Sequence, residues 1–194
     1  MERFIEALKA CPVIAAARDE REAELAALSH AGVVFLLGGT IMTLPQMVET
    51  AKSSGKPVFV HLDLVSGLGH DAAAAFWCAQ VAKPDGLIST RAAILRKARE
   101  QGLITIQRLF AMDSSAIGSG AKQAQLNKPD MVEILPGLVP KAVRMLREQL
   151  PELPIIAGGL VTQIDEIRAM LGAGALGVST GERALWALSK AELL

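Results

Sequence analysis

The chain contains eight short apolar runs, each bounded by turn-forming residues and followed by a longer stretch with helical periodicity. The runs predict β-strands at 12–17, 33–37, 57–64, 86–90, 103–110, 131–135, 154–157 and 176–180. The stretches between and after them predict helices at 19–30, 43–54, 71–83, 91–101, 114–127, 139–150, 162–172 and 182–190. This alternation restricts the chain to a β/α architecture.

Strands this apolar, separated by helices, are typical of a parallel sheet that helices cover on its outer side. Eight near-equal units in 194 residues, of which 51% are hydrophobic, favour a compact (β/α)8 barrel of the TIM type with one domain over residues 1–194. An open doubly wound sheet is the structural alternative.

Barrels of this type bind ligands where the strands end, and phosphate groups after strands seven and eight. Strand seven leads into Gly158 and Gly159, and strand eight ends in Ser179, Thr180 and Gly181. Glycines let backbone N–H groups approach an anion, the hydroxyls add donors, and the following helix N-terminus adds partial positive charge. We therefore expect these five residues to bind phosphate, although tight turns alone also require glycine.

Five polar residues in the other strands predict a site for ligand hydroxyl groups. His61 and Asp63 lie two residues apart in strand three and are expected on one face, directed into the barrel. Gln107 and Glu133 fit the inward face of strands five and six, and Arg108 lies near a strand end. For His61 taken alone, a hydrogen-bonded interior role is the better interpretation.

Two further arrangements of these side chains are open. Arg108 and Asp113 are placed to form an ion pair that holds the loop after strand five. Asp63 and Glu133 could hold a divalent cation, but two carboxylates without a ligand cluster do not indicate a metal, and we predict none.

The lysine positions bear on whether the protein is an enzyme. None of the nine lysines falls in a predicted strand, which disfavours a Schiff-base aldolase. An isomerase that uses Glu133, Asp63 and His61 as acid and base remains the alternative function. No cofactor motif is present.

The charge is unevenly distributed, although the net charge is zero. From residue 91 to residue 147 the chain carries ten Lys and Arg against four Asp and Glu. Candidate nucleic-acid contacts on two of the predicted helices are Arg96, Lys97, Arg99, Lys141 and Arg144. On the residues alone, a solvated outer helix face explains such a cluster better.

Other features bear on the environment of the protein. Cys11 and Cys78 lack the spacing of a zinc site or disulfide framework, and the apolar runs are too short to span a membrane, so we expect a cytoplasmic protein. The helix predicted at 71–83 is apolar nearly all round. Two interpretations explain this apolar surface equally well: a homodimer interface through Phe76 and Trp77, or burial of the helix under neighbouring loops.

Eight segments, one per predicted strand and in order, resemble the glycerol-3-phosphate-responsive antiterminator family. They are PVIAA (12–16), FLLGGTI (35–41), VFVHLDLVSGL (58–68), DGLIST (85–90), TIQRLFAMDS (105–114), KPDMVEILPG (128–137), IAGGL (156–160) and GVSTGERALW (177–186). The family's motif positions are occupied by His61, Asp63, Gln107, Arg108, Asp113, Glu133, Gly158, Gly159, Ser179 and Thr180.

This resemblance implies a barrel protein that binds the effector glycerol 3-phosphate and then acts on the leader mRNA of glycerol-utilisation genes to prevent premature termination. It implies a regulator and not a catalyst. The chain differs from the family pattern at two positions: Arg91 follows IST where lysine is expected, and Gly181 stands where serine is common. The second difference removes a hydroxyl from the predicted phosphate site.

Overall fold

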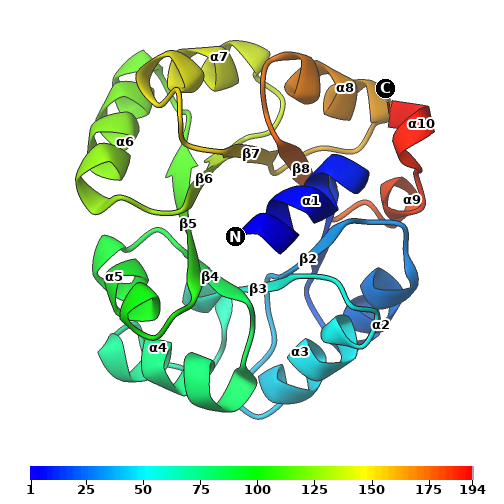
Figure 1. Cartoon of the computed structure of the whole chain (residues 1–194), viewed down its shortest axis with the longest axis vertical. Helices are drawn as coiled ribbons and strands as arrows, with labels where there is room; N and C mark the ends of the chain where they lie inside the picture. Colours follow the sequence, from blue (N-terminus) through cyan, green and yellow to red (C-terminus); the bar gives the residue numbers. More distant parts are fainter. Residues whose placement is uncertain (194) are drawn as a thin grey trace.

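The computed structural model describes residues 1–193 and shows a closed barrel of eight parallel strands (Figure 1). The strands are β1 (Val13–Ala17), β2 (Val33–Leu36), β3 (Val58–His61), β4 (Gly86–Ser89), β5 (Ile104–Phe110), β6 (Met131–Leu135), β7 (Ile155–Gly158) and β8 (Gly177–Thr180). Each strand pairs with the next, and β1 pairs with β8 through Ile14 opposite Ser179. The predicted barrel is confirmed, and the open sheet is excluded.

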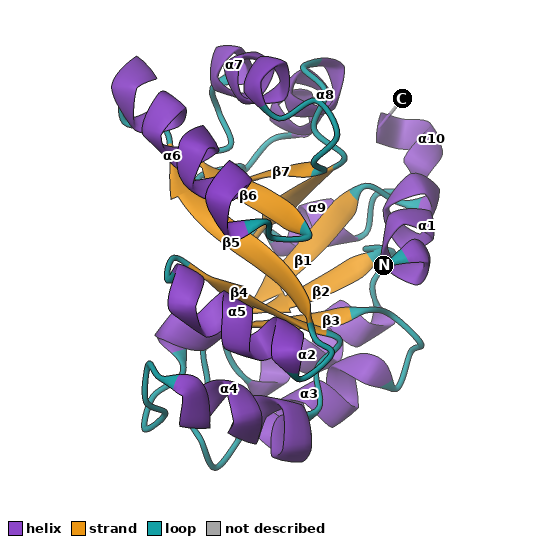
Figure 2. Cartoon of the chain, turned by 60° about the vertical axis from the view of Figure 1, so that its left-hand side comes forward, coloured by secondary structure: helices purple, strands orange, loops and turns teal. Residues whose placement is uncertain are grey.

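Helices surround the strands (Figure 2). The outer layer consists of α2 (Glu20–Leu28), α3 (Leu44–Lys52), α4 (Ala72–Trp77), α5 (Ala92–Glu100), α6 (Ser114–Asn127), α7 (Pro140–Gln149), α8 (Ile164–Gly172), α9 (Arg183–Trp186) and α10 (Lys190–Leu193). The first helix, α1 (Glu2–Ala10), instead lies across one end of the barrel (Figure 1).

The strands separate two apolar cores, which is why their residues are buried on both faces. Inside the barrel, Phe59 packs edge-on against Phe35, with 5.7 Å between ring centroids, and against Phe4 of α1, at 4.9 Å. Phe4 and Leu8 of α1 belong to this inner core. The helix therefore closes the end of the barrel at which the strands begin, and leaves the other end for a site.

Two of the predicted helix starts are confirmed by their caps. Asp19 accepts a hydrogen bond from the backbone N–H of Glu22 at 2.8 Å, and Asp71 accepts one from Ala74 at 2.9 Å. Ser114, in contrast, is already inside α6, because Asp113 caps that helix by accepting from Ala116 at 2.7 Å. Asp113 is thus a capping residue, and the ion pair predicted between it and Arg108 does not form.

The apolar helix predicted at 71–83 consists of α4 and a π-helical turn, η2 (Cys78–Ala82). Trp77 packs partly against the outer core, whereas Phe76 is exposed. Burial against neighbouring segments therefore explains why residue 77 is apolar, but it does not explain the exposed aromatic side chain of Phe76.

Candidate functional site

A small cavity of about 90 Å³ opens where the strands end, opposite α1. Its walls are formed by Ala16, Arg18, Leu37, Arg108, Glu133, Leu135, Gly159, Leu160, Ser179, Thr180 and Gly181. Six of the ten residues predicted to bind ligand line it, and His61, Asp63, Gln107 and Gly158 do not. The predicted phosphate turns and the polar residues of β5 and β6 thus meet in one place.

Glu133 lies at the centre of the polar network in this cavity. Arg108 Nε donates to Glu133 Oε2 and Ser179 Oγ donates to Glu133 Oε1, both at 2.8 Å. The side chains of Arg108 and Glu133 are only 9% and 1% exposed, so this is a buried ion pair. The register of the β5–β6 pair explains this contact, because Arg108 of β5 is the direct partner of Glu133 in β6.

The predicted inward orientation of Gln107 is wrong. Gln107 is the register partner of Val132, which belongs to the core between strands and helices. Its amide oxygen accepts a hydrogen bond from Asn127 Nδ2 of α6 at 3.2 Å. Since side chains alternate along a strand, the inward direction of Arg108 places Gln107 on the opposite face. Gln107 therefore holds α6 against the barrel.

Asp63 does not share a strand face with His61, because β3 ends at His61 and a 3-10 turn, η1 (Leu62–Leu64), follows. Its carboxylate accepts hydrogen bonds from Ser89 Oγ at 2.8 Å, Thr90 N at 2.9 Å and Thr90 Oγ1 at 3.0 Å. Burial raises the pKa of Asp63, but these bonds outweigh burial and hold the pKa below its usual value. Asp63 thus fixes the loop after β4.

His61 is buried at the end of β3, with 2% of its surface exposed. Its Nδ1 has no hydrogen-bond partner within residues 1–193. Burial, and secondly the positive charge of Arg108, lower the pKa of His61 from 6.5 to about 4. The imidazole is therefore neutral near neutral pH.

This pKa predicts how stability depends on pH. The unfolded chain binds the proton of His61 more readily than the folded protein, so the contribution to stability is complete above pH 6.5 and is lost as the pH falls toward about 4. We expect a loss of about 3 kcal/mol over this window, since one pKa unit corresponds to about 1.4 kcal/mol. Urea unfolding from pH 4.5 to 7.5 measures it.

A His61→Gln variant should flatten this pH profile, whereas His70→Gln, at an exposed position, should leave it unchanged. A wild-type free energy of unfolding that stays constant from pH 6.5 to 4.5 would contradict the buried neutral state of His61.

The glycines after β7 have different roles. A Cβ on Gly158 would lie 2.0 Å from Ser179 Oγ and 2.7 Å from Glu133 Oε1, so the absence of a side chain makes room for that hydrogen bond. Gly159 has a φ of +82° and lines the cavity. In contrast, Thr180 uses its hydroxyl to hold the turn, donating to the carbonyl of Val161 at 2.7 Å.

Arg18, which the sequence did not single out, provides a cationic group beside this turn. It follows β1 directly, and a Cβ on Gly181 would lie 2.8 Å from one terminal nitrogen of Arg18. The side chain is 61% exposed and only loosely paired, 3.9 Å from Glu22. Because the guanidinium lies over Gly181, a side chain at position 181 would collide with it, which explains the glycine at this position.

The helix expected to stabilise an anion after β8 is shorter than predicted. The segment 182–190 contains only the four residues of α9 before the chain turns into α10. A helix this short provides little dipole, so Arg18 is the stronger electrostatic element. The buried Trp186 fixes the turn by donating from Nε1 to the carbonyl of Thr180 at 2.8 Å.

Some of the residues predicted to contact nucleic acid have charges that pair within the protein, and others do not. On α5, Lys97 pairs with Glu100 at 2.8 Å, and the Arg99 guanidinium donates to the carbonyl of Lys128. Arg96 on the same helix is exposed. Lys141 and Arg144 are exposed on α7, and no ion pair of either is found within residues 1–193.

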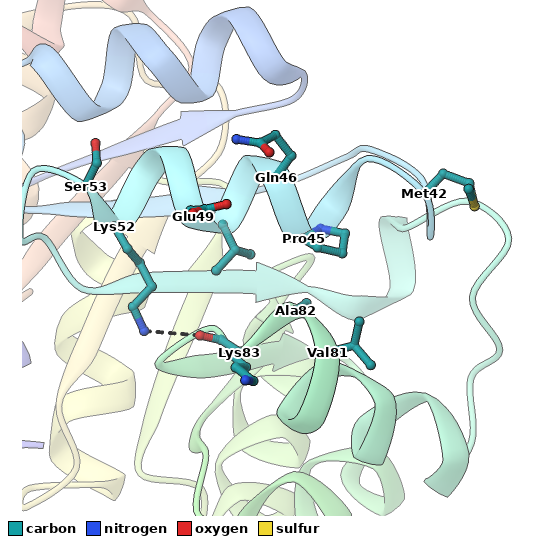
Figure 3. Close-up of a pocket in the computed structure, with 10 residues that line it drawn as sticks. Met42, Pro45, Gln46, Glu49, Lys52, Ser53, Val81, Ala82 and Lys83 are labelled. Atoms are coloured by element: carbon teal, nitrogen blue, oxygen red, sulfur yellow. Dashed lines mark hydrogen bonds between the residues drawn. The ribbon is translucent and has the colours of Figure 1, made fainter.

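A much larger groove, of about 880 Å³, lies elsewhere, between α3 and η2 (Figure 3). Figure 3 shows Lys52 reaching the carbonyl of Lys83 there, at 3.1 Å. Its walls come from the outer helices and their loops, and contain neither the buried polar residues nor the strand-end glycines. We therefore assign the functional site to the smaller cavity.

Within the described part of the chain, no group of three or more His, Cys, Asp or Glu side chains is arranged to hold a metal ion. Among residues 1–193, no helix is long and apolar enough to cross a membrane.

The chain is similar in sequence and in fold to several known proteins. The uncharacterized protein YgcP of Escherichia coli K12 is 37% identical over 183 residues, which are 94% of this chain and 95% of that protein. A crystal structure of the glycerol uptake operon antiterminator regulatory protein of Listeria monocytogenes superposes on this chain with a TM-score of 0.81. The two sequences are 32% identical, and the match covers 91% of this chain and 95% of the Listeria chain.

A glycerol uptake operon antiterminator-related protein of Thermotoga maritima is 34% identical, with a TM-score of 0.80 over 91% of this chain and 98% of its own. The deoxyribose phosphate aldolase of Aeropyrum pernix is 14% identical, with a TM-score of 0.70 over 96% of both chains, and shares the fold alone. Residues 13–186 match the model of one family, described as glycerol-3-phosphate responsive antiterminator, and the chain therefore belongs to this family.

Proposed function

We propose that this protein is a transcription antiterminator that binds glycerol 3-phosphate at the end of its barrel and, in that state, binds the leader mRNA of glycerol-utilisation genes in the cytoplasm. The observation that carries the proposal is the strand-end cavity, in which an incompletely neutralised arginine faces two glycine turns beside a buried polar network. Membership of the glycerol-3-phosphate responsive antiterminator family supports both the proposed effector and the proposed regulatory role.

In this proposal the phosphate lies between Arg18 and the turns at Gly159 and Gly181. Both glycines allow a close approach of the backbone, and the guanidinium supplies the charge and paired donors that suit a phosphate. Ser179 retains a lone pair that can accept from a ligand hydroxyl while its own proton is held by Glu133.

The hydroxyls of the glycerol moiety are assigned to Arg108 and Glu133. Each carboxylate oxygen of Glu133 accepts one bond in the protein and can accept another from the ligand. His61 and Asp63 lie outside the cavity wall, so we assign them a supporting role through their charge and loop contacts.

The size of the cavity supports a site that opens when the ligand enters. A volume of about 90 Å³ equals about three water molecules, enough for a phosphate group but not for the whole effector. Leu160 is the wall residue most able to move, because it is 73% exposed. Its φ of +64° is also unfavourable for a residue with a side chain.

An isomerase-like phosphosugar enzyme on the same barrel is the competing function, and one set of measurements separates the two. Calorimetry should show glycerol 3-phosphate binding more tightly than inorganic phosphate or glycerol. The ligand should strengthen binding of a glycerol uptake operon leader transcript in a gel-shift titration. Phosphorus NMR should show the ligand unchanged after prolonged incubation; a new phosphorylated product would refute the non-catalytic assignment.

A further inference from the structure

Large apolar side chains are exposed beside the strand-end cavity, at the end of β5 and on the loops after β5, β6 and β7. They form what we call the apolar rim, consisting of Phe110, Met112, Leu138, Val139 and Leu160. Met112 is 85% exposed and Phe110 is 51% exposed. Clusters of exposed apolar residues beside a ligand site are typical of surfaces that contact a partner.

Next to the rim is a groove of about 440 Å³ between the first turns of α6 and α7, here called the α6–α7 groove. Met112 and Val139 of the rim line it, together with Met145 and Lys141. The walls of the groove therefore contain both apolar side chains and the positively charged Lys141.

The charges around this groove suit a polyanion. Helix α6 carries Lys122 and no acidic residue, and the first two turns of α7 carry Lys141 and Arg144, all three exposed. One acid, Asp113, also lines the groove, and its carboxylate caps α6 by accepting a hydrogen bond from the N–H of Ala116. On α5, in contrast, Glu100 already neutralises Lys97.

Backbone hydrogen bonds connect the groove to the ligand cavity. Leu135 lines the cavity, and its carbonyl accepts from the N–H of Ala111, a residue of the groove, at 2.7 Å. In the next loop, Gly137 N donates to the carbonyl of Gly159 at 3.0 Å, and Leu138 follows Gly137 in the rim. A movement of Gly159 on ligand entry would thus reach Leu138 of the rim over one or two residues.

We propose that the apolar rim and the α6–α7 groove form the surface that binds single-stranded RNA, and that the effector controls it through the loops it shares with the ligand cavity. Unpaired bases pack on Phe110 and Met112, and Lys141 and Arg144 contact the RNA phosphates. An apolar surface alone suits a protein partner as well, but the excess of free cations favours RNA. The inference rests on the proposed function.

Two variants and one matched control test this surface. The first variant is Lys141→Ala with Arg144→Ala, the second is Phe110→Ala, and the control is Arg96→Ala with Lys97→Ala on α5. Each is titrated with a glycerol uptake operon leader transcript at several salt concentrations and with saturating glycerol 3-phosphate. Affinity for the effector without RNA serves as the test of folding.

We expect the α7 double variant to lose at least tenfold in RNA affinity, and the slope of log affinity against log salt to fall by about 1.4, because each lost contact to a single-stranded phosphate removes about 0.7. Phe110→Ala should lose about tenfold with an unchanged slope. The α5 control should lose less than threefold.

The inference is overturned if the α5 control loses as much RNA affinity as the α7 variant, or if the α7 variant and Phe110→Ala both bind RNA like the wild type. Wild-type RNA affinity combined with lost self-association would identify the rim as a protein interface instead. If the wild-type protein binds no leader transcript even with effector, the proposed function itself fails.

Discussion

Gly181→Asp should lower the affinity for glycerol 3-phosphate more than 100-fold, to the limit of calorimetric detection. The new carboxylate would pair with Arg18, whose terminal nitrogens lie 2.8 and 2.9 Å from the position of a Cβ on residue 181. It would also repel the phosphate. A 100-fold loss corresponds to about 2.7 kcal/mol, a reasonable cost for cancelling one cation and adding a like charge in a small cavity.

Gly181→Ala is the matched control for this variant. Its methyl group meets the flexible end of an exposed arginine, which can shift, so the loss should stay below about tenfold. Thermal unfolding of both variants should remain close to that of the wild type, since Gly181 lies at the surface turn after β8. Unchanged affinity in Gly181→Asp would place the phosphate elsewhere.

Glu133→Ala should lower the free energy of unfolding by about 3–5 kcal/mol, because it leaves the buried guanidinium of Arg108 without its partner. For a chain of this size, the melting temperature should fall by about 6–20 °C. Urea and thermal unfolding followed by circular dichroism measure both quantities.

Two controls separate the buried charge from a general effect of substitution. Asp165→Ala removes an exposed ion pair, that of Arg168 and Asp165 at 3.0 Å, and should cost less than about 1 kcal/mol. Arg108→Met combined with Glu133→Leu removes both buried charges and should recover most of the stability lost in Glu133→Ala. A double variant as unstable as the single one would argue against an unpaired charge as the cause.

The eight apolar runs predict the barrel well because its strands are buried on both faces and so leave a continuous apolar signal. The same continuity hides which residues of a strand point to the axis. Gln107 and Arg108 are neighbours in an apolar run, and only the pairing of Arg108 with Glu133 determines which of them enters the cavity. The sequence contains no local signal for that register.

The positions of Asp63 and Arg18 depend on where strands end and on which strands are neighbours. The run at 57–64 keeps an alternating, strand-like pattern past His61, so it does not reveal the turn that redirects Asp63 toward Ser89 and Thr90. Arg18 is a single cation after an apolar run. Its relevance follows from the pairing of β1 with β8, which brings it over Gly181; a search for cations directly after predicted strands would have found it.

The closure of the barrel between β1 and β8 has a consequence for protein synthesis. Arg18 follows the first strand and Gly181 follows the last, so the proposed phosphate site is assembled from residues at opposite ends of the strand order. Ribosomes add about 5–20 residues per second, and earlier units can begin to fold while later ones are still being made. A product of translation that stops before Gly177 lacks β8 and has no site, whatever structure its first seven strands reach. Under the proposed function, a chain can therefore bind the effector only after β8 has been synthesised.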